Sequence, residues 1–176
     1  FQDMSGITAL PSLTELHSQF NNVTRISEMS WRYMAMLYLE NNGLTSLTFS
    51  QVLLNLKVMN ISRCKLGGLP NDFFNFVPNV HTIVLDRNHL LTLPDSINSA
   101  AWLENLSVSG NVLSEINLNF SRLINLKRLD LHGNNLKSVG SDIWMSPTLN
   151  VLNLSSNFLI EFPDPPTSFE ALPLAL

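Results

Sequence analysis

The chain has 176 residues, of which 10 are basic and 14 are acidic, giving a net charge of −4, and 45% of them are hydrophobic. Such a chain can bury a sizeable core, and its mildly acidic balance lacks the basic footprint of proteins that bind nucleic acid. No apolar run reaches the length of about 18 residues that a membrane helix needs, and the first residues show no secretion-signal pattern, so we expect no direct membrane insertion. The single cysteine, Cys64, cannot form an internal disulfide, which favours a reducing, cytoplasmic location.

One pattern returns every 21 to 24 residues along the chain. It reads apolar, two spacers, apolar, one spacer, apolar, two spacers, asparagine, one spacer, apolar. Its seven copies begin at Leu13, Met34, Leu56, Val80, Leu103, Leu126 and Leu149. A pattern with this period is typical of a leucine-rich repeat array.

Each copy predicts one short strand, because its alternate apolar residues would point into a shared core. The asparagine eight residues after each start, such as Asn88, is expected to be buried and to bond backbone groups of its own coil and of the adjacent coil. Cys64 takes that position in the third copy, which predicts weaker hydrogen bonding between the coils there. Pairs such as Leu69–Pro70 then open a segment of short helical turns or extended chain. The predicted fold is an α/β solenoid, a right-handed coil with a parallel concave β-sheet and an irregular or short-helical convex side.

The repeat spacing also predicts the domain organisation. We interpret residues 1–176 as one array, in which residues 1–12 are the tail of an earlier repeat and residues 172–176 begin a further one. The array is therefore expected to continue beyond both ends of this sequence.

Nothing in the pattern predicts catalysis, a cofactor or a metal site. His17 and His132 share the strand face but are separated by five coils, which is roughly 24 Å at the spacing of neighbouring strands. His81 and His89 belong to one coil but lack a third ligand, and Cys64 has no histidine in its coil. Because a catalytic site needs a nucleophile, a base and an orienting group at one point, we expect this chain not to be an enzyme.

The outward-facing strand positions favour binding of another protein. Alternation places residues two and four positions after each start on the solvent side of the sheet, and four of these residues in coils two to four are apolar or aromatic. Charged residues, among them Glu40, form a rim around them. Apolar patches with a charged rim are typical of protein interfaces. The predicted partner-binding residues are Met36, Tyr38, Val58, Arg63, Val84, Asp86, Arg87, Arg128 and Asp130.

The repeat unit from Val80 to Ile97, with Leu93–Pro94 after its asparagine, resembles the intracellular Ras-type class of leucine-rich repeats, which includes the Shoc-2 and Erbin scaffolds. The stretch from Leu152 to Pro166 looks most like the late repeats of fungal adenylate cyclases. This resemblance implies a cytoplasmic signalling protein whose repeats bind a Ras-type small GTPase at the inner face of the plasma membrane, with the cyclase catalytic domain elsewhere. Charge complementarity with an acidic partner would favour Arg63, Arg87 and Arg128 as contacts.

Two other functions stay open. Five Asn-x-Ser/Thr sequons, at Asn22, Asn60, Asn105, Asn119 and Asn153, are compatible with a glycosylated surface receptor that recognises a ligand such as microbial cell-wall material. Alternatively, the coils could be a structural spacer between other domains.

Overall fold

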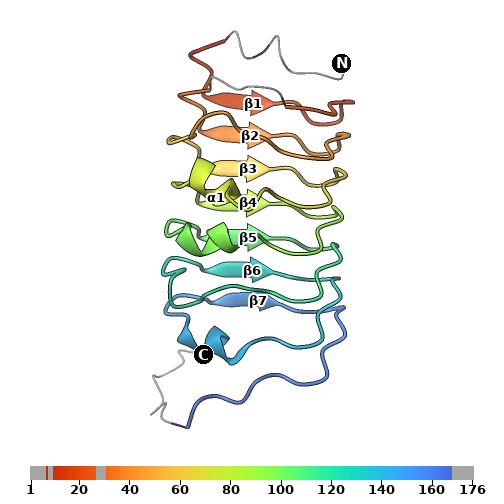
Figure 1. The fold of residues 1–176 in the computed structure, drawn as a ribbon, viewed down its shortest axis with the longest axis vertical. Helices are drawn as coiled ribbons and strands as arrows, with labels where there is room; N and C mark the ends of the chain where they lie inside the picture. The colour runs from red at the N-terminus through yellow and green to blue at the C-terminus, as the bar shows by residue number, and fades with distance from the viewer. Residues whose placement is uncertain (1–6, 8–9, 27–30, 168–176) are drawn as a thin grey trace.

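A computed structural model describes residues 7, 10–26 and 31–167 of the chain. These residues form a stack of coils, each of which contributes one strand to a single parallel sheet (Figure 1). The strands are β1 (Glu15–His17), β2 (Met36–Tyr38), β3 (Val58–Asn60), β4 (Thr82–Val84), β5 (Asn105–Ser107), β6 (Arg128–Asp130) and β7 (Val151–Asn153). They lie side by side in chain order, so every neighbour in sequence is also a neighbour in space. The predicted solenoid is therefore confirmed.

Register in the sheet follows the repeat position by position. Leu37 of β2 pairs with Met59 of β3, and Met59 pairs with Ile83 of β4. Because the middle residue of each strand points inward, these side chains are fully buried. They belong to one continuous hydrophobic cluster that also contains Leu39, Leu85 and Leu131 of separate coils. The core is thus a spine along the stack and not a set of separate cores.

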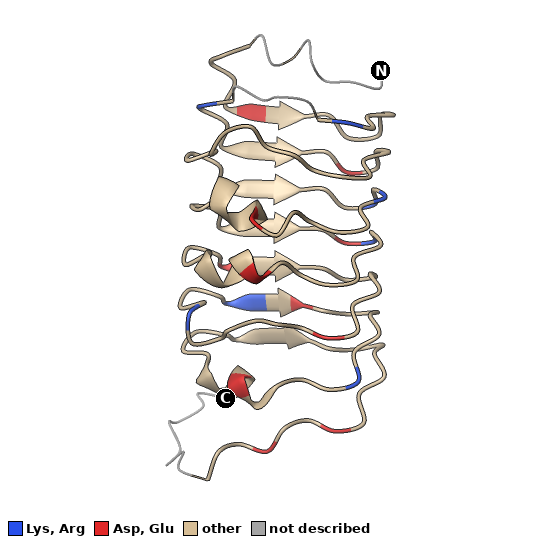
Figure 2. Ribbon diagram, viewed as in Figure 1, with Lys and Arg blue, Asp and Glu red and all other residues tan. Residues whose placement is uncertain are grey.

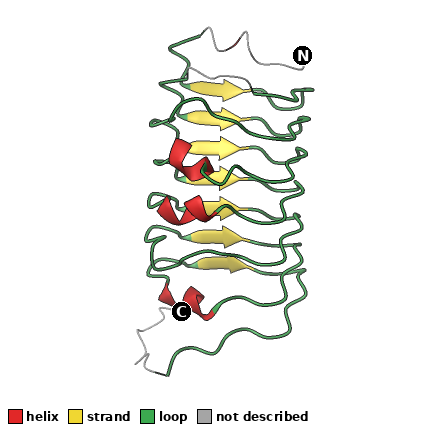
Figure 3. Cartoon of the chain, in the orientation of Figure 1, coloured by secondary structure: helices red, strands yellow, loops and turns green. Residues whose placement is uncertain are grey.

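Within the residues that the structure describes, the convex side carries only short helical segments, as Figure 3 shows. These are the α-helix α1 (Phe73–Phe76) and two 3₁₀ helices, η2 (Asp95–Ser99) and η3 (Ser141–Met145). Pro94 precedes η2 in an extended conformation, as expected of a proline just outside a helical turn. The expectation that the convex segments are either short helical turns or extended chain is confirmed, since three of them contain a helical turn. None of these helices is long and apolar enough to span a membrane in the described ranges.

A ladder of buried asparagines joins successive coils after the strands. The Oδ1 atom of Asn88 accepts a bond from the backbone N–H of Leu66 at 3.1 Å. Its Nδ2 atom donates to the carbonyls of Ile61 in the preceding coil and Leu85 in its own, both at 2.9 Å. The same three-bond pattern recurs at Asn42, Asn111, Asn134 and Asn157. Each amide therefore satisfies buried backbone groups that the turn would otherwise leave without partners.

Cys64 interrupts this ladder. Its Sγ lies 3.5 Å from the carbonyl oxygen of Leu39, in the place where an asparagine would put its amide nitrogen. Burial raises the pKa of the Cys64 thiol, although the backbone N–H groups of Asn42 and Leu44 oppose that shift. A thiol is a weak donor and a weak acceptor, so one coil is held by weaker bonds than its neighbours.

A second asparagine ladder, which the repeat pattern did not predict, lies just before the amino ends of the strands. Asn55 donates to the carbonyl of Arg32, Asn79 to that of Leu54, and Asn125 to that of Ala101, over distances of 2.7 to 2.9 Å. Trp102 takes the equivalent place in the coil of β5. It is 55% exposed and stacks on His81, with ring centroids 6.1 Å apart. Hydrogen bonds at both ends of the strands hold adjacent coils in register.

Each strand is followed by a residue with positive φ. The row consists of Phe20, Asn41, Arg63, Arg87, Gly110, Gly133 and Ser156, with φ between 53° and 65°. Glycine adopts this conformation freely, whereas other residues lose about 1–2 kcal/mol in it. The turn therefore lifts several large side chains over the carboxyl ends of the strands, which is where the candidate site lies.

Candidate partner-binding face

The two outward columns of the sheet hold most of the predicted contact residues. Met36, Val58 and Arg128 lie in the first column, on β2, β3 and β6. Tyr38, Val84 and Asp130 lie in the second column, on β2, β4 and β6. Figure 2 shows that most of the sheet carries no charge and that β6 bears both a basic and an acidic residue. The remaining three, Arg63, Asp86 and Arg87, follow the strands at their carboxyl ends.

The apolar part of the face lies over β1 to β3. Met36 is 38% exposed and its register partner is Val58. Tyr38 donates to Met36 Sδ at 3.8 Å and stacks on His17 with ring centroids 4.6 Å apart. Val84 is separated from Tyr38 by Asn60, so it lies apart from this patch. His17 extends the patch: it stands in the same outward column as Tyr38, although it was not among the predicted contacts.

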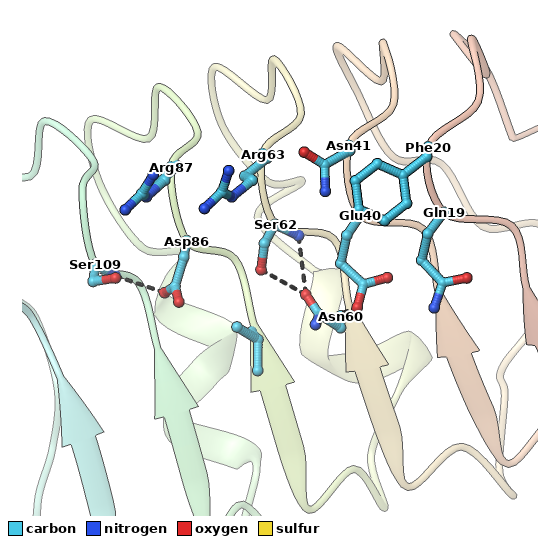
Figure 4. Close-up of a pocket in the computed structure, with 11 residues that line it drawn as sticks. Gln19, Phe20, Glu40, Asn41, Asn60, Ser62, Arg63, Asp86, Arg87 and Ser109 are labelled. Carbon is cyan, nitrogen blue, oxygen red and sulfur yellow. Dashed lines mark hydrogen bonds between the residues drawn. The ribbon is translucent and has the colours of Figure 1, made fainter.

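A groove of about 470 Å³ runs along the carboxyl ends of the first five strands (Figure 4). It is lined by Gln19, Phe20, Glu40, Asn41, Asn60, Ser62, Arg63, Val84, Asp86, Arg87 and Ser109. We call this feature the rim groove. It brings together four of the predicted contacts, namely Arg63, Val84, Asp86 and Arg87.

Hydrogen bonds fix the floor of the rim groove. Asn60 Nδ2 donates to Glu40 Oε1 at 2.6 Å, while Asn60 Oδ1 accepts from the backbone N–H and the hydroxyl of Ser62. At the other end, Asp86 Oδ1 accepts from Ser107 Oγ at 2.6 Å and from the Ser109 N–H at 2.9 Å. The floor residues are therefore held in place before any partner arrives.

The two arginines at the lip have no carboxylate partner. In the part of the chain that the structure describes, the ion pairs are His17–Glu15 and Lys127–Glu104, and neither includes Arg63 or Arg87. Both arginines are exposed, both have φ of 53°, and Figure 4 shows their guanidinium groups side by side. An arginine fork without a partner is suited to bind a carboxylate of another molecule.

Arg128 and Asp130 lie in a different place from the rim groove. They line a smaller depression of about 280 Å³ over β4 to β7, together with Val84, Val151 and Asn153. Asp130 Oδ1 accepts a bond from the backbone N–H of His132 at 2.9 Å. The nine predicted residues therefore fall into two hollows and one apolar patch on the same side of the sheet.

The geometry of the titratable groups does not resemble a catalytic site. His132 Nδ1 lies 2.8 Å from Ser155 Oγ on an exposed surface, but Asp130 bonds the backbone of His132 and not its ring. That pair lacks an orienting acid and an enclosed site. Across residues 7, 10–26 and 31–167, no three His, Cys, Asp or Glu side chains are placed to hold a metal ion.

Comparison with known proteins agrees with the repeat architecture. The family model described as Leucine Rich Repeat matches residues 55–76 and 125–146. A leucine-rich repeat protein of Leptospira interrogans has a similar solved structure, with a TM-score of 0.79 and 28% identity over 89% of this chain and 41% of that one.

Among curated proteins, adenylate cyclase of Schizosaccharomyces pombe is 36% identical over 105 residues, covering 60% of this chain and 6% of the cyclase. Mouse podocan is 36% identical over 123 residues, covering 66% of this chain and 20% of podocan. Human leucine-rich repeat-containing protein 7 is 32% identical over 72 residues, covering 41% of this chain and 5% of that protein. The chain thus spans a small part of the length of each of these relatives.

Proposed function

Because the chain is a leucine-rich repeat protein, we propose that it is a protein-binding module whose concave sheet face and rim groove receive a partner protein. The observation that carries this proposal is the pair of exposed arginines, Arg63 and Arg87, above a floor already fixed by hydrogen bonds. The same side of the sheet carries the aromatic and thioether patch of Tyr38 and Met36 on β2. Tyrosine and arginine are, with tryptophan, the residues most enriched among those that dominate the binding energy of protein interfaces.

The partner that we propose is a Ras-type small GTPase, and the parent protein a signalling protein such as an adenylate cyclase. Support comes from the 36% identity to the repeats of a fungal adenylate cyclase. In this proposal the array acts in the cytoplasm and is recruited to the inner face of the plasma membrane by its partner. Arg63, Arg87 and Arg128 would meet an acidic surface of the GTPase.

The test is capture of a purified Ras-type GTPase on the immobilised chain, with the GTPase loaded either with a GTP analogue or with GDP. We expect preferential capture of the GTP form, and a loss of about tenfold or more for the triple variant Arg63→Glu, Arg87→Glu and Arg128→Glu. The control is Arg122→Glu, an exposed arginine outside the strands. Equal capture of both nucleotide forms, or none, would refute the GTPase as partner.

A surface receptor is the competing function, and its basis is the sequons. At Asn60 both side-chain polar atoms are engaged, with Glu40 on one side and Ser62 on the other. Asn153 likewise accepts a bond from Ser155, two residues on. The spacing that defines a sequon is therefore also the spacing of a local hydrogen bond in this turn. Secretion of the chain from cultured eukaryotic cells, followed by mass spectrometry of Asn22 and Asn60, would decide; glycan on Asn60 would favour the receptor.

A further inference from the structure

One carboxylate oxygen in the rim groove has no hydrogen-bond partner. Glu40 Oε2 is buried, while Glu40 Oε1 accepts from Asn60 at 2.6 Å. Figure 4 shows Glu40 between Asn60 on one side and Gln19 and Phe20 of the preceding coil on the other. A buried acceptor without a donor is unfavourable, so this atom is a place where a donor from another molecule would be stabilised.

The surrounding residues do not supply that donor. The amide nitrogen of Asn60 is already used on Oε1, and the Gln19 amide nitrogen lies 3.3 Å from His17 Nδ1. Neither Arg63 nor Arg87 forms an ion pair with Glu40 in the described structure. Gln19 is half-buried and Phe20 is 80% exposed, so neither side chain is fixed in the hydrophobic core.

The groove is charged in two parts. Glu40 stands at the end nearer β1, and the Arg63 and Arg87 guanidinium groups extend toward the other end (Figure 4). Asp86 Oδ1 accepts only uncharged donors and keeps its charge, so the Arg63 and Arg87 end holds two cations and one anion, while the other end holds the single anion of Glu40. A purely acidic ligand would leave Glu40 unsatisfied, and a purely basic one would be repelled by the arginines.

We infer that the rim groove recognises a protein segment that carries a basic side chain and an acidic side chain on the same face, with the base bound by Glu40 and the acid by Arg63 and Arg87. This inference rests on the proposed protein-binding function and adds Glu40 as a specificity-determining residue. Coils are spaced by about 4.8 Å, so Glu40 lies roughly 5 to 10 Å from the two arginine positions. Side chains two residues apart on an extended segment are about 7 Å apart, which matches that range. The ring of Phe20 offers a further contact to the cation.

The experiment uses the whole isotope-labelled chain and short blocked peptides as probes, with binding followed by NMR. The peptide Gly-Lys-Gly-Glu-Gly carries both charges, while Gly-Lys-Gly-Gln-Gly and Gly-Gln-Gly-Glu-Gly carry one each. We expect saturable shifts of the amides of Gln19, Glu40, Arg63 and Arg87, and binding of the doubly charged peptide about tenfold tighter than of either single-charge peptide. Glu40→Gln should abolish that difference, while the matched control Glu115→Gln should retain it.

The outcomes separate this inference from the proposed function. Shifts confined to other residues, or equal binding of all three peptides, would overturn the inference. Tightest binding of the acidic peptide, unchanged in Glu40→Gln, would show that the arginines act alone and would also overturn it. If Glu40→Gln leaves capture of the GTPase unaltered, the inference fails while the protein-binding function stands. If the unmodified chain captures no GTPase at all, the GTPase is instead refuted as the partner.

Discussion

Replacing Cys64 with asparagine should stabilise the array. The rungs at Asn42 and Asn88 show what the third coil lacks, namely an amide that bonds two carbonyls and one backbone N–H. By the same register, Asn at position 64 would donate to the carbonyls of Leu39 and Ile61 and accept from the N–H of Leu44. The present sulfur makes only long contacts to carbonyl oxygens, at 3.5 Å to Leu39 and 3.7 Å to Ser62.

The expected gain follows from counting these bonds. Each of the three new hydrogen bonds is worth about 1 kcal/mol net. Part of that gain is offset by the loss of the sulfur contacts and of the apolar burial of the thiol, so Cys64→Asn should add about 1–2 kcal/mol to the free energy of unfolding. For a chain of this size that corresponds to a rise of about 2–8 °C in Tm. Urea denaturation followed by circular dichroism would measure it.

Two variants complete the test of the ladder. Asn88→Cys creates the same defect one coil later and should lower the free energy of unfolding by a similar amount. Cys64→Ala removes the thiol without adding an amide and should not stabilise the array. If Cys64→Asn were no more stable than Cys64→Ala, the reasoning that the asparagines join the coils by hydrogen bonds would be wrong.

Three further predictions concern the turns, the second ladder and pH. Gly110→Ala should lower the free energy of unfolding more than Gly133→Ala does. Both glycines have positive φ, but at position 110 the added Cβ would also lie 3.2 Å from Arg87 Cγ, whereas the nearest atoms at position 133 are 3.6 Å away. Thermal melts of the two variants compare them directly. Asn125→Ala should cost about 0.5–1 kcal/mol in urea denaturation, because it removes the bond to Ala101, whereas Asn150→Ala should be neutral; equal effects would refute the second ladder. Burial raises the pKa of the Cys64 thiol, so the neutral thiol contributes stability that is fully present below the ordinary thiol pKa of about 8.5. That contribution is lost as the pH rises from about 8.5 through the higher pKa of the folded chain. The free energy of unfolding should therefore fall over this pH range in the unmodified chain and not in Cys64→Ala.

The fold could be predicted because one residue period determines both local structure and packing. Leu37, Met59 and Ile83 stand at the same place in the repeat, and the register pairs them as the pattern requires. The interruption of the ladder at Cys64 could be predicted for the same reason, since the other copies carry asparagine at this position.

Other features depend on side-chain geometry that a periodic pattern does not contain. The unsatisfied Oε2 of Glu40 arises from the way Asn60 and Ser62 share their bonds, and no repeat position encodes that. The second ladder had a visible signal, since Asn55 and Asn79 each stand one residue before a repeat start. That signal was missed because those positions lie outside the apolar pattern.

The buried ladder has a direction that bears on how the chain is made. The N–H of Leu66 donates to Asn88 Oδ1 and that of Leu90 to Asn111 Oδ1, so this backbone donor of each turn finds its acceptor on the following coil. During synthesis, which runs from the N-terminus, a coil therefore stays incomplete until more than twenty further residues have left the ribosome. The coil made last is therefore always the one whose backbone groups still lack partners, and each added coil completes the hydrogen bonds of the coil before it.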